Sequence, residues 1–135
     1  MQQENLVLIL ARDLADKLAS AVFVCDREGT LVYYNDKAAE ILGRPFAEVG
    51  RMRMDQWLAT WSLQDLQGRP LRPDELPLVA ALREVEPTHS SVRVKGADGE
   101  VRDIEVTALP LLVRKDELVG AVAMFWELPS DSRRS

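Results

Sequence analysis

The chain has 135 residues, of which 47% are hydrophobic and 29% are charged, and its net charge is −5. This size and composition predict one folded domain and exclude a disordered chain, while the negative charge argues against binding to nucleic acid or to an anionic membrane. Cys25 is the only cysteine, so an internal disulfide and a thiolate metal cage are both excluded, as expected for a protein of the reducing cytoplasm.

The first predicted element is an amphipathic helix over residues 4–19, which contain no Gly or Pro. Leucines recur four residues apart along it, at Leu6, Leu10, Leu14 and Leu18. Such a stripe packs either on the sheet of its own domain or on the same helix of a second copy, and we expect homodimerisation. No apolar run reaches the roughly 20 residues that span a bilayer, so no membrane segment is expected.

A β-hairpin followed by a short helix is predicted next. Residues 21–25 and 30–34 are β-branched or aromatic runs on either side of a turn that ends in Gly29, and glycine accepts the positive φ of such turns. Asn35 then precedes residues 36–43, which end in glycine. An asparagine N-cap and a terminal glycine are typical of helix boundaries, so Asn35 is predicted to be a structural cap.

The middle of the chain, residues 45–73, has an irregular pattern. Trp57 and Trp61 are four residues apart and predict one short helix, whose rings either close the core or cover a ligand. Residues 73–86 begin with a proline and two acidic residues, which favour a first helical turn. They are therefore predicted to form the longest internal helix.

The last third changes to strand-like patterns at residues 92–94, 101–108 and 118–126, which predict an antiparallel meander. With the opening hairpin this gives an α+β fold, in which short helices gather on one face of a five-stranded antiparallel sheet. The predicted organisation is a flanking helix at 1–19, a domain at 20–128 and a disordered polar tail at 129–135.

In their order and spacing these segments resemble a PAS domain, from about Leu18 to Leu128. Residues 24–43 resemble the opening hairpin and first helix of that family. Residues 65–82, which include Gly68-Arg69-Pro70-Leu71, resemble a pattern common in bacterial PAS sensors. Residues 98–100, the hairpin region of Pro110 and residues 118–122 resemble the closing strands. The resemblance implies a sensory or interaction module with a hydrophobic pocket, often dimeric through an N-terminal helix.

Such modules usually regulate an attached kinase, cyclase, phosphatase or transcription factor. The final strand of the family commonly leads into an output helix through an Asp-Ile-Thr-like motif, whereas this chain has Glu127-Leu128-Pro129. Proline disfavours a helical conformation at the preceding Leu128. The chain is therefore expected to act through a separate, unknown partner protein or to be one piece of a larger protein.

Every second residue of the last three predicted strands should face the helices, because side chains alternate along a strand. These residues either fill the core or line a cavity, and both interpretations remain open. Small or flexible residues favour a cavity, and the absence of polar groups favours an apolar ligand. The candidate pocket residues are Trp57, Trp61, Val79, Leu82, Val92, Val94, Ile104, Val106, Ala108, Gly120, Val122 and Met124.

No cofactor, metal or catalytic residue is expected. Haem-binding relatives take a histidine from the longest internal helix, but His89 falls at a predicted strand start. Light-oxygen-voltage relatives need a cysteine over the flavin, whereas Cys25 is on the first strand and is predicted to be a buried, inert thiol. The alternatives to a ligand-binding sensor are an interaction domain with a filled core and, less favoured, a haem or flavin redox sensor.

Overall fold

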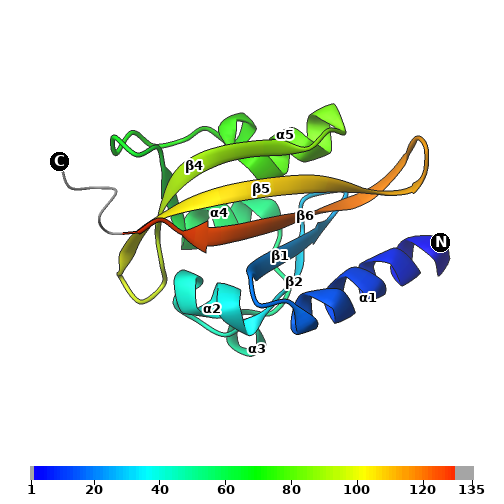
Figure 1. The fold of residues 1–135 in the computed structure, drawn as a ribbon, viewed down its shortest axis with the longest axis horizontal. Coiled ribbons are helices and arrows are strands. Elements are labelled where there is room, and N and C mark those ends of the chain that lie inside the picture. Colours follow the sequence, from blue (N-terminus) through cyan, green and yellow to red (C-terminus); the bar gives the residue numbers. More distant parts are fainter. Residues whose placement is uncertain (1, 130–135) are drawn as a thin grey trace.

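The structure is a computed structural model that describes residues 2–129, with side chains from Leu6 onward. Its helices are α1 (Gln2–Lys17), α2 (Asp36–Leu42), α3 (Phe46–Val49), α4 (Met54–Thr60), the 3₁₀ turn η1 (Pro73–Glu75) and α5 (Pro77–Glu84). Its strands are β1 (Ala21–Asp26), β2 (Leu31–Tyr34), β3 (Ser62–Gln64), β4 (Thr88–Lys95), β5 (Val101–Arg114) and β6 (Glu117–Glu127), as drawn in Figure 1. Most of the predicted tail, residues 130–135, lies outside the described residues.

One antiparallel sheet of six strands forms the centre of the fold, in the order β2-β1-β6-β5-β4-β3. The predicted number of five strands is corrected by β3, a short edge strand in which Leu63 lies opposite Val94 of β4. A strand of 3 residues is too short to show a clear alternation of side chains, so the pattern did not reveal it. The predicted α+β class is confirmed.

The opening hairpin and the helix after it form as predicted. β1 and β2 pair on either side of a turn in which Gly29 has a φ of 85°. Asn35 is the N-cap of α2, and Gly43 ends the helix in the left-handed conformation with a φ of 86°. Side chains rarely adopt this backbone conformation, which explains the glycine at each position.

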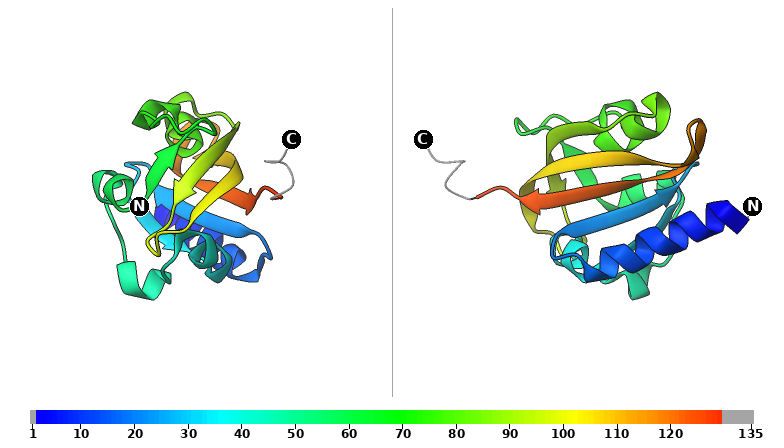
Figure 2. Two further views of the ribbon diagram at one scale, coloured as in Figure 1. Left: turned by 90° about the vertical axis from the view of Figure 1, so that its left-hand side faces the viewer. Right: turned by 45° about the vertical axis from the view of Figure 1, so that its right-hand side comes forward.

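Different helices cover the two faces of the sheet (Figures 1 and 2). Helices α2 to α5 lie on the inner face, where the main hydrophobic cluster includes Phe23 and Trp61. α1 lies on the outer face, where its Ala15 packs with Val22 and Val24 of β1 in a separate cluster. The central strands are therefore apolar on both of their faces.

α1 is held to the sheet by its small and charged residues. Ala15 is 1% exposed, the guanidinium of Arg12 lies 4.6 Å from the ring centroid of Tyr33, and the Tyr33 hydroxyl donates a hydrogen bond to Asp16. The helix ends at Lys17 rather than at the predicted residue 19. The leucine stripe lies beside these contacts and stays exposed, with Leu10, Leu14 and Leu18 lining a groove between the helix and the outer face of the sheet.

The prediction of one continuous helix over residues 73–86 is wrong, because the structure divides this segment into two elements. The chain forms the turn η1, passes through Leu76 in an extended conformation with φ −79° and ψ 138°, and starts α5 at Pro77. The proline ring excludes the helical region for the residue before it, which accounts for the break at Leu76. α5 ends at Glu84, and its C-cap is Val85, a non-glycine residue with a positive φ of 55°.

Candidate functional site

A small apolar cavity lies between the inner face of the sheet and the helices that cover it. Its volume is about 80 Å³, roughly half of the 150 Å³ of an engineered apolar cavity that admits benzene. The lining contains only hydrophobic side chains, which are Phe23, Leu42, Trp57, Trp61, Leu63, Leu76, Pro77, Leu78, Val92, Val94, Ile104, Val106, Ala123 and Phe125. Such a space favours an apolar occupant over a richly hydrogen-bonded one.

Half of the residues predicted for the pocket lie around this cavity. They are Trp57, Trp61, Val92, Val94, Ile104 and Val106. Val79 and Leu82 instead line a neighbouring surface cleft, and Ala108 is fully buried in the core without lining the cavity. The predictions missed the lining residues from β1, α2, β3, the start of α5 and the inner face of β6.

Three predicted pocket residues lie on the wrong face of the sheet. Val122 and Met124 of β6 pack on the outer cluster beneath α1, and Gly120 shares their parity. The inner face of β6 is formed by residues of the other parity, including Ala123 and Phe125. Both parities of β6 are apolar because helices cover both faces, so alternation alone could not assign them.

Gly120 has a backbone role instead. A Cβ atom at this position would lie 2.2 Å from the carbonyl oxygen of Cys25 on the neighbouring strand β1, far inside van der Waals contact. The glycine therefore permits the close approach of β1 and β6, and it is not part of a ligand pocket.

Both tryptophans close the core at the cavity and are anchored by their indole nitrogens. Trp57 is 4% and Trp61 is 2% exposed. The Nε1 of Trp57 donates to the carbonyl of Gly29 at 2.8 Å, and that of Trp61 donates to the carbonyl of Leu42 at 2.9 Å. Phe23 packs edge-on against both rings. These bonds fix the rings, since a buried indole N–H needs a partner.

The size of the cavity predicts different outcomes for two inner-face residues of β5. Val106→Leu adds one methylene beside the cavity, and we expect a change of less than about 1 kcal/mol in the free energy of unfolding. Ala108→Leu enlarges a residue with no adjacent space and should cost about 1–3 kcal/mol through overpacking. Val106→Trp should also cost about 1–3 kcal/mol, because an indole exceeds the available volume. Urea unfolding measures all three, and equal costs for Val106→Leu and Ala108→Leu would contradict the cavity.

Cys25 is a buried thiol on the inner face of β1. Burial raises its pKa to about 12, so the reactive thiolate is almost absent at neutral pH. We therefore expect no alkylation of native protein by iodoacetamide at pH 8, and full alkylation in urea, as measured by intact mass. Rapid modification of the folded protein would contradict this assignment of an inert structural thiol.

His89 lies on the outer face of the sheet, across the sheet from the cavity. Its ring nitrogens lie 2.7 Å from Oγ1 of Thr107 and 2.6 Å from Oε1 of Glu105. Ser91 donates a hydrogen bond to Glu105, and this bond and the His89 ring hold the pKa of that carboxyl below its ordinary value. Within residues 2–129, no group of three or more His, Cys, Asp and Glu residues is arranged to hold a metal ion.

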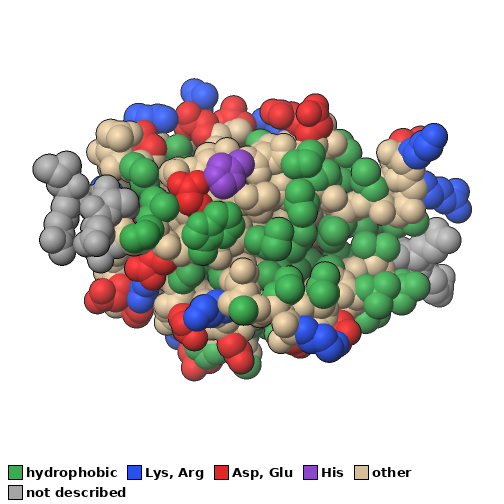
Figure 3. Space-filling view, viewed as in Figure 1, with side chains coloured by type: hydrophobic (Ala, Val, Ile, Leu, Met, Phe, Trp, Pro, Cys, Tyr) green, Lys and Arg blue, Asp and Glu red, His purple; other side chains and the backbone are tan. Residues whose placement is uncertain are grey.

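The predicted dimerisation residues form an exposed apolar surface on α1 and at Leu18, just after its end. Leu6, Leu10 and Leu14 are 53%, 57% and 58% exposed, and Leu18 is 39% exposed. A groove of about 360 Å³ runs between this helix and the outer face of β5 and β6. Figure 3 shows hydrophobic side chains gathered over the same region. Among the described helices, none is long and apolar enough to cross a membrane.

Asn35 connects four segments through its buried side chain. Its Oδ1 accepts hydrogen bonds of 3.0 Å from the amides of Val22 and Ala38. Its Nδ2 donates bonds of 2.9 Å to the carbonyls of Ala15 and Ser20. The residue is therefore both the predicted cap of α2 and the junction of that helix with α1, the loop at Ser20 and β1.

Comparisons with known proteins agree with this architecture. A family model described as "PAS fold" matches residues 15–130. No curated protein sequence matches the chain.

Solved structures give the same result at the level of the fold. The PAS domain of a Colwellia psychrerythraea protein has a TM-score of 0.63 at 16% identity and covers 90% of this chain and 97% of its own. The PAS domain of Bordetella pertussis BvgS has a TM-score of 0.61 at 18% identity, with coverages of 93% and 88%. The Rhodobacter sphaeroides LOV protein has a TM-score of 0.70 at 16% identity, with coverages of 98% and 71%.

Proposed function

The chain belongs to the PAS fold family, whose members are sensory and signal-transduction modules. We propose that it is a sensor that couples its inner cavity to α1, the helix predicted to form the dimer. The inferred signal is occupancy of the inner cavity by a small apolar molecule. The output is a change at the outer face, where α1 and a second copy meet, that is read by a partner protein.

The observation that carries this proposal is the position of β6. Ala123 and Phe125 line the inner cavity, while Val122 and Met124, the neighbours in the same strand, pack beneath α1. Because close-packed residues transmit small displacements, a change in the cavity reaches α1 through the thickness of a single strand. β5 also reaches both spaces, but Ile104 and Val106 line the cavity and Leu109 and Leu111 line the groove at different places along the strand, whereas the four residues of β6 are consecutive.

The second candidate is an interaction domain without a ligand. It is favoured by the cavity volume of about 80 Å³, which is small beside the 300–1,000 Å³ of typical sites for drug-sized ligands. We also propose a cytoplasmic location, which the single free thiol supports. Neither function requires a catalytic group.

Native mass spectrometry of protein purified without refolding tests the proposal, with the denatured mass as its reference. A bound mass that is lost on denaturation supports the sensor and identifies the class of ligand. A dimer with no bound mass, unchanged by exposure to small apolar compounds, would contradict ligand sensing and favour the interaction domain. The absorbance spectrum of the same sample tests for haem or flavin, because either cofactor would colour the protein.

A further inference from the structure

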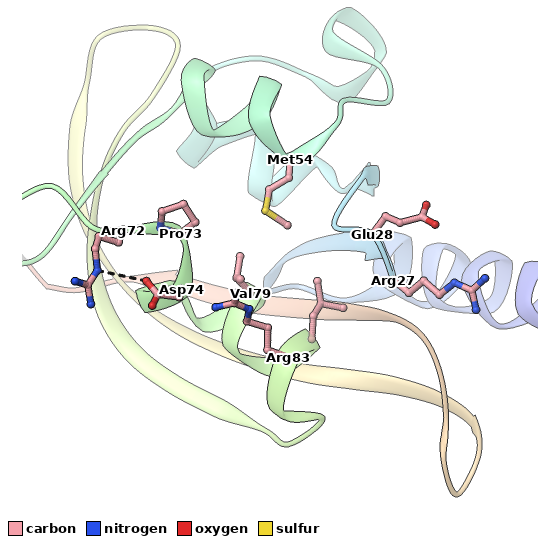
Figure 4. A pocket seen from close by; sticks show the side chains of 9 residues that line it. Arg27, Glu28, Met54, Arg72, Pro73, Asp74, Val79 and Arg83 are labelled. Atoms are coloured by element: carbon pink, nitrogen blue, oxygen red, sulfur yellow. Dashed lines mark ion pairs between the residues drawn. The ribbon is translucent and has the colours of Figure 1, made fainter.

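A second, larger opening lies on the surface beside α5, separate from the inner cavity. It has a volume of about 750 Å³ and is bounded by the β1–β2 turn, the start of α4, η1 and α5. Figure 4 shows its side chains, with Met54 pointing from α4 toward Val79 on α5. We call this opening the α5 cleft. Its volume falls in the range of small-molecule sites.

The floor of the α5 cleft is apolar. Val79 is 6% and Leu82 is 9% exposed, and Met54 packs against the same hydrophobic cluster. Because Val79 and Leu82 are already buried, a ligand in the cleft would remove apolar surface from water chiefly at Met54, which is only partly buried, and this favours binding. Methionine also adapts its shape to different ligands.

The rim of the cleft carries more positive than negative charge, in a chain whose net charge is −5. Three arginines line it, Arg27, Arg72 and Arg83, against two acidic residues, Glu28 and Asp74. Asp74 already lies 3.4 Å from Arg72. The local excess of positive charge favours an anion.

Arg83 is the guanidinium best suited to bind that anion. It projects from the last turn of α5, beside the apolar floor. Among the described residues, no carboxylate forms an ion pair with it, whereas Arg69, Arg72 and Arg93 each have one. A guanidinium binds a carboxylate through two parallel hydrogen bonds.

From this combination we propose that the α5 cleft binds a small amphipathic carboxylate. The carboxylate pairs with Arg83, and the apolar body lies on Met54, Val79 and Leu82. The inner cavity has no polar lining and takes an uncharged ligand, so the two sites differ in chemistry.

Titration with octanoate tests this proposal, with methyl NMR spectra as the readout. Saturable shifts are expected at Met54 and Val79. Arg83→Gln should weaken octanoate binding about tenfold or more, because it removes the charge-assisted bonds. Arg44→Gln is the matched control, since Arg44 is an exposed arginine outside the cleft whose pairing with Glu48 is also exposed; it should change the affinity by less than about twofold.

Two neutral or truncated probes complete the experiment. Octanol lacks the charge and acetate lacks the apolar body, so each should bind the cleft more weakly than octanoate. Equal octanoate affinity in wild type and Arg83→Gln, or no saturation up to about 10 mM, would overturn the proposal. Shifts confined to Ile104 and Val106 would also overturn it, because they would place the probe in the inner cavity. Failure of the sensor function is seen separately, by mass spectrometry of the purified protein.

Discussion

Asn35→Ala is expected to lower the free energy of unfolding by about 3–5 kcal/mol, a large part of the stability of a domain of this size. The asparagine side chain is 4% exposed and makes four hydrogen bonds. Its removal leaves the amides of Val22 and Ala38 without these buried acceptors, and each unsatisfied group costs about 1–3 kcal/mol. Loss of the N-cap of α2 alone would account for only about 0.5–2 kcal/mol.

Urea unfolding at one fixed protein concentration measures this effect. Asp36→Ala, the exposed neighbour at the start of the same helix, is the control and should cost about 0.3–1 kcal/mol. Asn35→Asp separates the two halves of the side chain, because it keeps both accepted bonds and replaces the donated bonds to Ala15 and Ser20 by repulsion. A cost for Asn35→Ala no greater than that of Asp36→Ala would show that Asn35 is not a structural junction.

The double substitution Leu10→Glu and Leu14→Glu is expected to convert a dimer into a folded monomer. Both side chains are more than half exposed in the single copy, so we expect the variant to keep its fold. Each leucine that becomes buried between two copies contributes about 1.5–3 kcal/mol. The dimer dissociation constant should therefore rise by at least about 100-fold.

Sedimentation equilibrium over a range around 10 µM measures the dissociation constant, and far-UV circular dichroism confirms that the variant is folded. Val85→Glu is the control, because Val85 is 41% exposed at the end of α5, on the opposite side of the sheet from α1. It should leave the dimer unchanged. A monomeric wild type at this concentration would refute dimerisation through α1.

Part of the fold could be predicted because it depends on short-range chemistry. The turn at Gly29 and the helix between Asn35 and Gly43 each need only local backbone conformations and local hydrogen bonds. The break before Pro77 follows from the same kind of rule, although the acidic first turn concealed it. Six of the twelve predicted pocket residues line the cavity. Four of them are bulky apolar residues that alternate along β4 and β5 and so share one buried face, and the other two are the tryptophans.

The sequence by itself determined the α+β class, the hairpin with its capped helix, the leucine stripe of α1 and the resemblance to PAS domains, since each depends on residue type and spacing. The tertiary structure alone decided which face of β6 meets the cavity, because both parities of that strand are apolar. It also decided that Asn35 joins residues as distant as Ala15, and that Met54, Val79 and Arg83 share one cleft. These relations depend on how strands register and helices pack across long sequence separations, which local patterns do not encode.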